Sequence, residues 1–204
     1  MLAYTDIDPH KKAFIFELDN VLYPEKDYLL QVYYLFASFI EYVETVPAAG
    51  ELIAFMKKVY ENHGAQRIFD KASEVFGIDE KYRENFERLH HTAKLPLKLL
   101  LFSQILPLLQ DMVVDRKQVF IITNGDPKQQ LNKTKQIEWH GLDEYLVIYF
   151  AKETVLKPDT ATLEHIMGKY NLIRRDLLII GASHIDQEFA QAAGVDYLDV
   201  GLLE

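Results

Sequence analysis

The sequence contains no cysteine, and this absence removes several kinds of chemistry. Without a thiol the chain forms no disulfide, uses no thiolate nucleophile and holds no cysteine-bound zinc or iron–sulfur centre. The patterns H-E-x-x-H, G-x-G-x-x-G and the P-loop are also missing, so zincin, dinucleotide-binding and P-loop nucleotide-hydrolysing sites have no support. Chemistry based on carboxylates, hydroxyls, amines and metal ions remains open.

Positive charge and long apolar runs are also scarce. Lys and Arg number 22 against 31 Asp and Glu, a formal net charge of −9. A chain this acidic repels a phosphate backbone, so we expect no nucleic-acid partner. The most apolar stretch, residues 28–40, is too short to cross a bilayer, and the stretch MLAYTDIDPHKK lacks the apolar segment of a signal peptide. We therefore expect no membrane partner and a cytoplasmic protein.

Short runs rich in Ile, Val, Leu and Phe predict buried strands. They alternate with helical patterns in the second half of the chain, as in parallel sheets covered by helices on both faces. The expected strands are 12–18, 118–124, 146–151 and 177–182, with a weaker one at 196–200. The expected helices between the later strands are 126–140, 160–171 and 184–194. This pattern indicates an α/β fold with a doubly wound, mainly parallel, Rossmann-like sheet.

The first two strands are separated by far more residues than one crossover helix needs. No strand pattern occurs in the interval, which predicts helices at 27–46, 48–63, 65–76, 79–91 and 97–114. We therefore expect a core domain of residues 1–23 and 97–204, interrupted by an all-helical insertion over residues 24–96.

Two features of the expected insertion have more than one interpretation. The helix over residues 28–43 is unusually aromatic. Its rings either pack inside the insertion, with tyrosine hydroxyls reaching water, or line a pocket or a homodimer surface. His90 and His91 are adjacent, so they diverge on a helix and are expected at the surface and not in one metal site.

Polar side chains follow four of the expected strands. Ligands of open α/β sheets bind at the carboxyl ends of the strands, so these side chains should converge. In chain order they are Glu17 and Asp19; Thr123, Asn124 and Gly125; Lys157; and Ser183 and Asp186. The side chains of Glu17 and Asp19, two residues apart, point to the same side of an extended chain. Carboxylates suit a metal ion or proton transfer, whereas the lysine, the hydroxyl and free N–H groups suit a phosphate.

In this order, the segments FELDNVL, IITNG, LKPD and IIGASHID resemble the four motifs of the haloacid dehalogenase (HAD) superfamily. Those motifs are a strand ending in Asp-x-Asp, a strand ending in Thr or Ser, a lysine, and Gly-Asp-Ser/Thr-x-x-Asp. The resemblance covers the whole expected core. It implies a phosphatase-like branch of the superfamily in which the helical insertion is a type-one cap.

The resemblance also implies a role for each matched residue. Catalytic roles fall on Glu17, Asp19 and Lys157, as nucleophile, general acid/base and charge-neutralising lysine. Phosphate-binding roles fall on Thr123, Asn124, Gly125 and Lys157. Roles as ligands of Mg²⁺ fall on Glu17, Asp19 and Asp186. The implied partner is a small phosphorylated molecule.

Two positions depart from the family pattern. Glu17 stands where the nucleophile is an aspartate, and Ala182 stands where the fourth motif has its first acid. An extra methylene misplaces the carboxylate, and a shift of roughly 1 Å can cost on the order of 10²-fold in rate. A lost carboxylate weakens Mg²⁺ binding or abolishes it. Alternatively, Glu17 reaches into the space of the missing acid, with Asp186 or His184 as partner.

These departures leave two functions open. The first is a Mg²⁺-dependent phosphomonoester phosphatase by descent, with weakened activity. The second is an inactive member of the same fold that binds a phosphorylated ligand or a protein.

Overall fold

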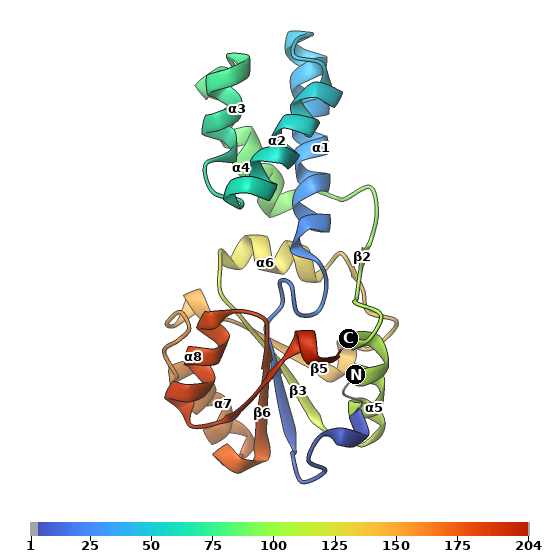
Figure 1. The fold of residues 1–204 in the computed structure, drawn as a ribbon, viewed down its shortest axis with the longest axis vertical. Coiled ribbons are helices and arrows are strands. Elements are labelled where there is room, and N and C mark those ends of the chain that lie inside the picture. Colours follow the sequence, from blue (N-terminus) through green and yellow to red (C-terminus); the bar gives the residue numbers. More distant parts are fainter. Residues whose placement is uncertain (1–3, 204) are drawn as a thin grey trace. The chain divides into compact units, whose positions relative to one another are not determined.

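A five-stranded sheet forms the centre of the first of two structural units (Figure 1). The computed structural model describes residues 4–203. The strands are β1 (Ala13–Phe16), β3 (Gln118–Thr123), β5 (Leu146–Phe150), β6 (Leu177–Gly181) and β7 (Asp196–Asp199). They lie in the order β5-β3-β1-β6-β7, and each neighbouring pair is parallel. The predicted fold class is confirmed.

Helices cover both faces of this sheet because its strands are apolar on both sides. Ile15 of β1 lies opposite Phe120 of β3 and Ile179 of β6, and these residues pack with α7 (Ala161–Tyr170) and α8 (His184–Ala193). α5 (Ile105–Val114) lies on the other side of the sheet (Figure 1). Burial of every β1 residue on both faces explains why its sequence lacks polar alternation.

The second unit is helical. It contains α1 (Glu25–Glu44), α2 (Ala49–His63), α3 (Ile68–Phe76) and α4 (Arg83–Thr92). α6 (Pro127–Thr134) begins in the first unit and ends in the second.

Short strands β2 (Leu99–Leu100) and β4 (Ile137–Glu138) form a two-stranded sheet. The 3₁₀ helices are η1 (Tyr4–Asp6), η2 (Glu80–Tyr82), η3 (Asp143–Tyr145), η4 (Ala151–Glu153), η5 (Arg174–Asp176) and η6 (Val200–Leu203).

The chain divides into two compact units, and the expected assignment to core and insertion stays a prediction. We call residues up to 24, 100–130 and from 137 onward the α/β unit, and residues 25–99 and 131–136 the helical unit. The sequence assigned residues 24–96 to the insertion, and residues 131–136 were not foreseen as part of it.

Two expected helices are too long. The helix expected at 97–114 starts only at Ile105, and the helix expected at 126–140 ends at Thr134. In both cases backbone pairing replaces helical turns, since the N–H of Leu99 donates to the carbonyl oxygen of Gln136 at 2.9 Å. Nothing in the local hydrophobic pattern reports this long-range pairing.

Most aromatic side chains at the start and middle of α1 pack inside the helical unit. Tyr28, Tyr33 and Phe36 are buried, and the Phe36 ring meets the Phe86 ring edge-on at 5.0 Å. Tyr34 and Tyr42 are 50% and 88% exposed. The packing interpretation therefore holds for the buried rings, and a homodimer surface stays a prediction.

His90 is not the surface residue that the sequence suggested. Its ring packs edge-on against Phe86 at 4.8 Å between centroids, and it is half-buried on α4. Burial, with smaller contributions from the charges of Lys133 and His91, lowers the pKa of His90 to about 4. The helical unit therefore favours the neutral imidazole.

None of the helices among residues 4–203 has the length and apolar character needed to cross a membrane.

The buried imidazole makes stability depend on pH. Between pH 6.5 and pH 4 the unfolded chain takes up a proton at His90 and the folded chain does not. The free energy of unfolding should therefore fall as the pH drops through this window, by up to about 3 kcal/mol from this residue. Urea unfolding from pH 7.5 to pH 4.5 should show a weaker pH dependence for His90→Gln than for wild type. His63→Gln, at the exposed end of α2, is the control and should keep the wild-type dependence. Equal curves for wild type and His90→Gln would contradict the assignment.

Candidate active site

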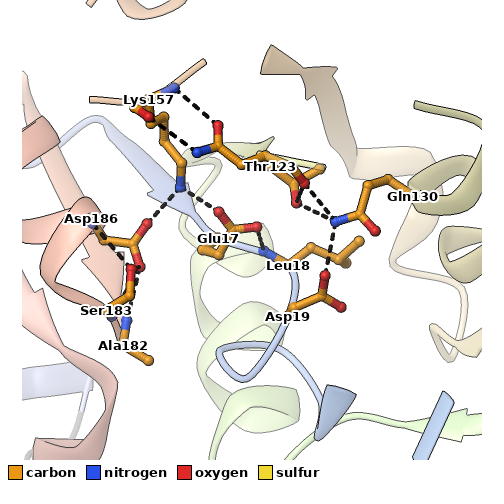
Figure 2. A network of polar contacts seen from close by, with 10 residues as sticks. Glu17, Leu18, Asp19, Thr123, Gln130, Lys157, Ala182, Ser183 and Asp186 are labelled. Carbon is orange, nitrogen blue, oxygen red and sulfur yellow. Dashed lines mark hydrogen bonds and ion pairs between the residues drawn. The ribbon is translucent and has the colours of Figure 1, made fainter. Parts of the chain in front are cut away.

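Residues predicted to form a site converge at one edge of the sheet (Figure 2). Glu17 follows β1, Thr123 ends β3, and Asp186 lies in the first turn of α8, directly after β6. Because these strands are parallel neighbours, their carboxyl ends meet. Lys157 comes from the loop after β5 and η4, and its side chain points toward both acids.

The Lys157 ammonium bridges two carboxylates. Nζ contacts an oxygen of Glu17 and lies 2.6 Å from Oδ1 of Asp186. The Lys157 and Asp186 side chains are 4% and 3% exposed, so water screens the three charges weakly. Burial alone would lower the pKa of Lys157, but the two carboxylates outweigh it and raise the pKa above its usual value. The lysine is therefore held in its charged form.

Asp186 is fixed on both of its oxygens. Oδ2 accepts hydrogen bonds from the Ser183 hydroxyl at 2.7 Å and from the backbone N–H groups of Ala182 and Ser183 at 3.2 and 3.1 Å. Ser183 in turn caps α8, since its hydroxyl accepts from the Asp186 N–H. Burial acts to raise the pKa of Asp186, but Lys157 and Ser183 together hold it below its usual value. Ser183 thus has a structural role at the start of α8.

Glu17 is held in place by the protein itself. One carboxylate oxygen accepts the Leu18 N–H at 2.8 Å, and the other contacts Lys157. The Thr123 hydroxyl also interacts with this carboxylate. Burial raises the pKa of Glu17, although Lys157, Thr123 and Leu18 act in the opposite direction. Both oxygens of Glu17 are therefore engaged by the protein, and nucleophilic attack would require one of them to leave its partner.

Asn124 holds the loop that carries Lys157. Its side-chain oxygen accepts the Lys157 N–H at 2.9 Å, and its side-chain nitrogen donates to the Lys157 carbonyl at 3.2 Å. Through these two contacts Asn124, the residue after β3, fixes the backbone that carries Lys157. The phosphate-binding role that the resemblance assigned to Asn124 stays a prediction, whereas its side chain is seen to hold the Lys157 loop.

Asp19 and Gln130 complete the network. The Tyr23 hydroxyl donates to one Asp19 oxygen at 2.6 Å, and the Gln130 amide donates to the other at 2.9 Å. Sequence reasoning missed Gln130, which lies in the polar run KQQLNK on α6 and matches no motif. That one glutamine of this polar run is buried could be recognised only once the fold was known.

The comparison with known protein families places this chain. A family described as haloacid dehalogenase-like hydrolase matches residues 14–200, nearly the whole chain. The chain belongs to the haloacid dehalogenase-like hydrolase family. A search of curated proteins found no match.

Solved structures of HAD-like proteins share the fold. One, described as a β-phosphoglucomutase from Thermotoga maritima, has 18% identity and a TM-score of 0.62, covering 90% of this chain and 82% of that one. A HAD hydrolase from Bacillus subtilis, solved with magnesium bound, has 18% identity and a TM-score of 0.59, covering 92% and 85%. A defluorinating L-2-haloacid dehalogenase has 15% identity and a TM-score of 0.59, covering 92% and 80%. These likenesses support the fold and leave the substrate open.

The structure shows the contacts of Glu17 and Ala182, the two residues that depart from the HAD motifs. Glu17 turns its longer side chain to Lys157 (Figure 2), and Ala182 is exposed and offers only its backbone N–H to Asp186. His184 faces solvent and pairs with Glu188 at 3.2 Å. The alternative in which His184 assists Glu17 therefore has no contact to support it.

The side chains of this HAD site do not fit a Mg²⁺ ion, the metal bound in the Bacillus subtilis HAD hydrolase. Among residues 4–203, no group of three or more His, Asp or Glu side chains is arranged to hold a metal. Two of the three predicted ligands, Glu17 and Asp186, turn their carboxylates to the ammonium of Lys157, and Ala182 supplies no oxygen from its side chain. Mg²⁺ is commonly held by one or two carboxylates and water, but here the ammonium already occupies these carboxylates and its charge would repel the ion.

The tight approach of Gly181 to Asp186 gives a test of this packing. A Cβ added at Gly181 would lie 2.4 Å from Cβ of Asp186, so Gly181→Ala should displace the acid from Lys157. We expect a loss of about 1–3 kcal/mol in the free energy of unfolding, measured with urea. Gly168→Ala in α7, where a Cβ would have no neighbour within 4 Å, is the control and should gain up to about 1 kcal/mol. If Gly181→Ala were as stable as wild type, the described packing would be wrong.

Proposed function

We propose that the chain is a phosphomonoester phosphatase by descent whose turnover is impaired. The observation that carries the proposal is the Lys157 ammonium at the strand ends, with Glu17 on one side and the Thr123 hydroxyl close to that acid. Phosphoryl transfer needs an aligned nucleophile together with groups that neutralise and position the phosphoryl oxygens. This core unit holds one group for each task.

The chemistry assigns a step to each residue. A Glu17 oxygen forms a bond to phosphorus while the bond from phosphorus to the leaving oxygen breaks, and Asp19 supplies a proton to that oxygen. Water then attacks the acyl-phosphate, its proton returns to Asp19, and phosphate and the Glu17 carboxylate are released. Lys157 and Thr123 hold phosphoryl oxygens throughout. The expected substrate is a small phosphorylated molecule.

The same geometry explains why turnover should be slow. Lys157 contacts one oxygen of Glu17 and the Leu18 N–H donates to the other, so an oxygen must leave one of these partners before it can attack phosphorus. The site holds three acids and one lysine: Glu17 and Asp186 pair with Lys157, whereas Asp19 accepts from Tyr23 and Gln130. A phosphate dianion therefore meets an excess of negative charge that Mg²⁺ would normally offset. We propose that Mg²⁺ binding is weak or absent.

A second candidate is an inactive HAD-fold protein that binds a phosphorylated ligand or a protein partner. The observation that favours it is the engagement of Asp19, because Tyr23 and Gln130 already occupy both of its oxygens. Proton transfer by Asp19 would require one of these donors to move. The helical unit as a substrate-selecting cap, a homodimer and a cytoplasmic location remain proposals from the sequence.

Restoring both acids should separate the candidates. The double variant Glu17→Asp with Ala182→Asp shortens the nucleophile and adds a carboxylate, which should create a Mg²⁺ site. We expect kcat/KM for p-nitrophenyl phosphate to rise at least about 100-fold over wild type in the presence of Mg²⁺. Chelation with EDTA should remove the gain. Adding Lys157→Met to the double variant should also remove it.

The activity of the wild-type protein distinguishes the impaired phosphatase from the inactive binder. Slow activity that disappears in Glu17→Ala would support the impaired phosphatase over the inactive binder. Activity found only in the double variant would favour the binder. If neither protein hydrolyses a phosphomonoester or binds inorganic phosphate, the phosphatase proposal is wrong.

A further inference from the structure

A buried glutamine amide joins three oxygens of the site (Figure 2). Nε2 of Gln130 lies 2.9 Å from Oδ2 of Asp19, 2.7 Å from Oγ1 of Thr123 and 2.9 Å from the carbonyl oxygen of Asn124. Gln130 is only 2% exposed. An amide nitrogen carries two protons, so the three oxygens share them. The amide oxygen could not take this place without facing the Asp19 carboxylate and the Asn124 carbonyl, which both only accept.

The backbone around Gln130 is fixed by the start of α6. The Asp126 side chain accepts the N–H of Lys128 at 2.9 Å and that of Gln129 at 3.2 Å, and the Asp126 carbonyl accepts the Gln130 N–H at 2.9 Å. Gly125 packs against the glutamine side chain, since a Cβ there would lie 3.4 Å from Cδ of Gln130. The amide is therefore presented from a rigid element of the α/β unit.

The amide decides which way the Thr123 hydroxyl can act. A hydroxyl has one proton to donate and can also accept. Because Gln130 donates to Oγ1, the hydroxyl proton is directed elsewhere. The carbonyl oxygen of Asn124 accepts it at 3.2 Å, and the carboxylate of Glu17 is a second partner. A phosphoryl oxygen only accepts hydrogen bonds, so it needs this proton.

Without Gln130 the proton would have a competing acceptor. The oxygens of Asp19 and Thr123 both lie within hydrogen-bond distance of the same amide nitrogen. With that nitrogen gone, the negatively charged Asp19 would attract the hydroxyl proton and would also repel an incoming phosphate. By donating to Asp19, the Gln130 amide weakens both the attraction of Asp19 for the hydroxyl proton and its repulsion of phosphate.

We propose that Gln130 is a positioning residue for phosphate: its amide keeps the Thr123 hydroxyl a donor toward a phosphoryl oxygen and shields that oxygen from Asp19. This rests on the proposed function, which supplies the phosphate ligand. Gln130 itself takes no part in bond making or breaking.

The test measures binding of inorganic phosphate by calorimetry, in wild type and in the Glu17→Asp, Ala182→Asp protein with Mg²⁺. Gln130→Met keeps the length of the side chain and removes the donor, and we expect about tenfold weaker binding at pH 7.5 in both backgrounds. Gln129→Met, the same change one residue earlier on α6, is the control and should bind as its parent does.

Gln130→Glu distinguishes positioning from mere space filling. At pH 7.5 its carboxylate would face that of Asp19, so binding should be at least as weak as in Gln130→Met. At pH 5 two adjacent carboxyls can share a proton, and the resulting O–H replaces the lost donor. Relative to its parent at the same pH, Gln130→Glu should therefore recover at pH 5, whereas Gln130→Met should not.

The outcomes separate the two proposals. If phosphate binds and Gln130→Met binds as tightly as its parent, Gln130 is no positioning residue, although the phosphate site stands. If Gln130→Glu and Gln130→Met lose affinity equally at both pH values, the glutamine only fills space and the proposal is also overturned. If neither background binds phosphate, both proposals are wrong.

Discussion

The ion-paired Lys157 is the interaction on which the site depends. It brings an acid from the end of β1 and an acid from the first turn of α8 to one ammonium group. Two carboxylates buried together without a cation would repel each other, and burial would drive protons onto them. A buried ion pair adds little net stability over apolar packing, but removing one partner costs several kcal/mol. The lysine therefore specifies the arrangement of the strand ends more than it strengthens the fold.

Much of this arrangement could be predicted from the sequence. Strands that are apolar on both faces indicated a parallel sheet, and parallel strands bring their carboxyl ends to one edge. Glu17, Thr123, Lys157 and Asp186 could therefore be placed together before their contacts were known. The order of the four motifs added the family, which the match over residues 14–200 shows.

Other parts could not be predicted, for physical reasons. Gln130 reaches the site because α6 folds back toward the strand end, and a polar helix face looks the same whether it meets water or a buried acid. The ends of the helices predicted at 97–114 and 126–140 depend on pairing between β2 and β4, which is non-local. His90 was misplaced because burial of one face of α4 depends on which helices pack against it.

The two substituted acids change what the shared architecture can do. With an aspartate nucleophile and a further acid, the site would have room and charge for a divalent cation. Here the longer Glu17 meets the lysine directly, and Ala182 contributes only a backbone N–H to Asp186. The fold, the lysine and the threonine match the family motifs, whereas Glu17 and Asp186 are engaged with Lys157 and Asp19 with Tyr23 and Gln130. This difference underlies the proposal that catalysis is impaired.

The contact between Glu17 and Lys157 can be measured directly with a double-mutant cycle. Urea unfolding of wild type, Glu17→Gln, Lys157→Met and the double variant isolates the coupling between the two side chains, since the loss of the Asp186 partner appears in both arms and cancels. The account predicts a coupling free energy of at least about 1 kcal/mol. Effects that add to within about 0.5 kcal/mol would show that the ion pair does not hold the site together.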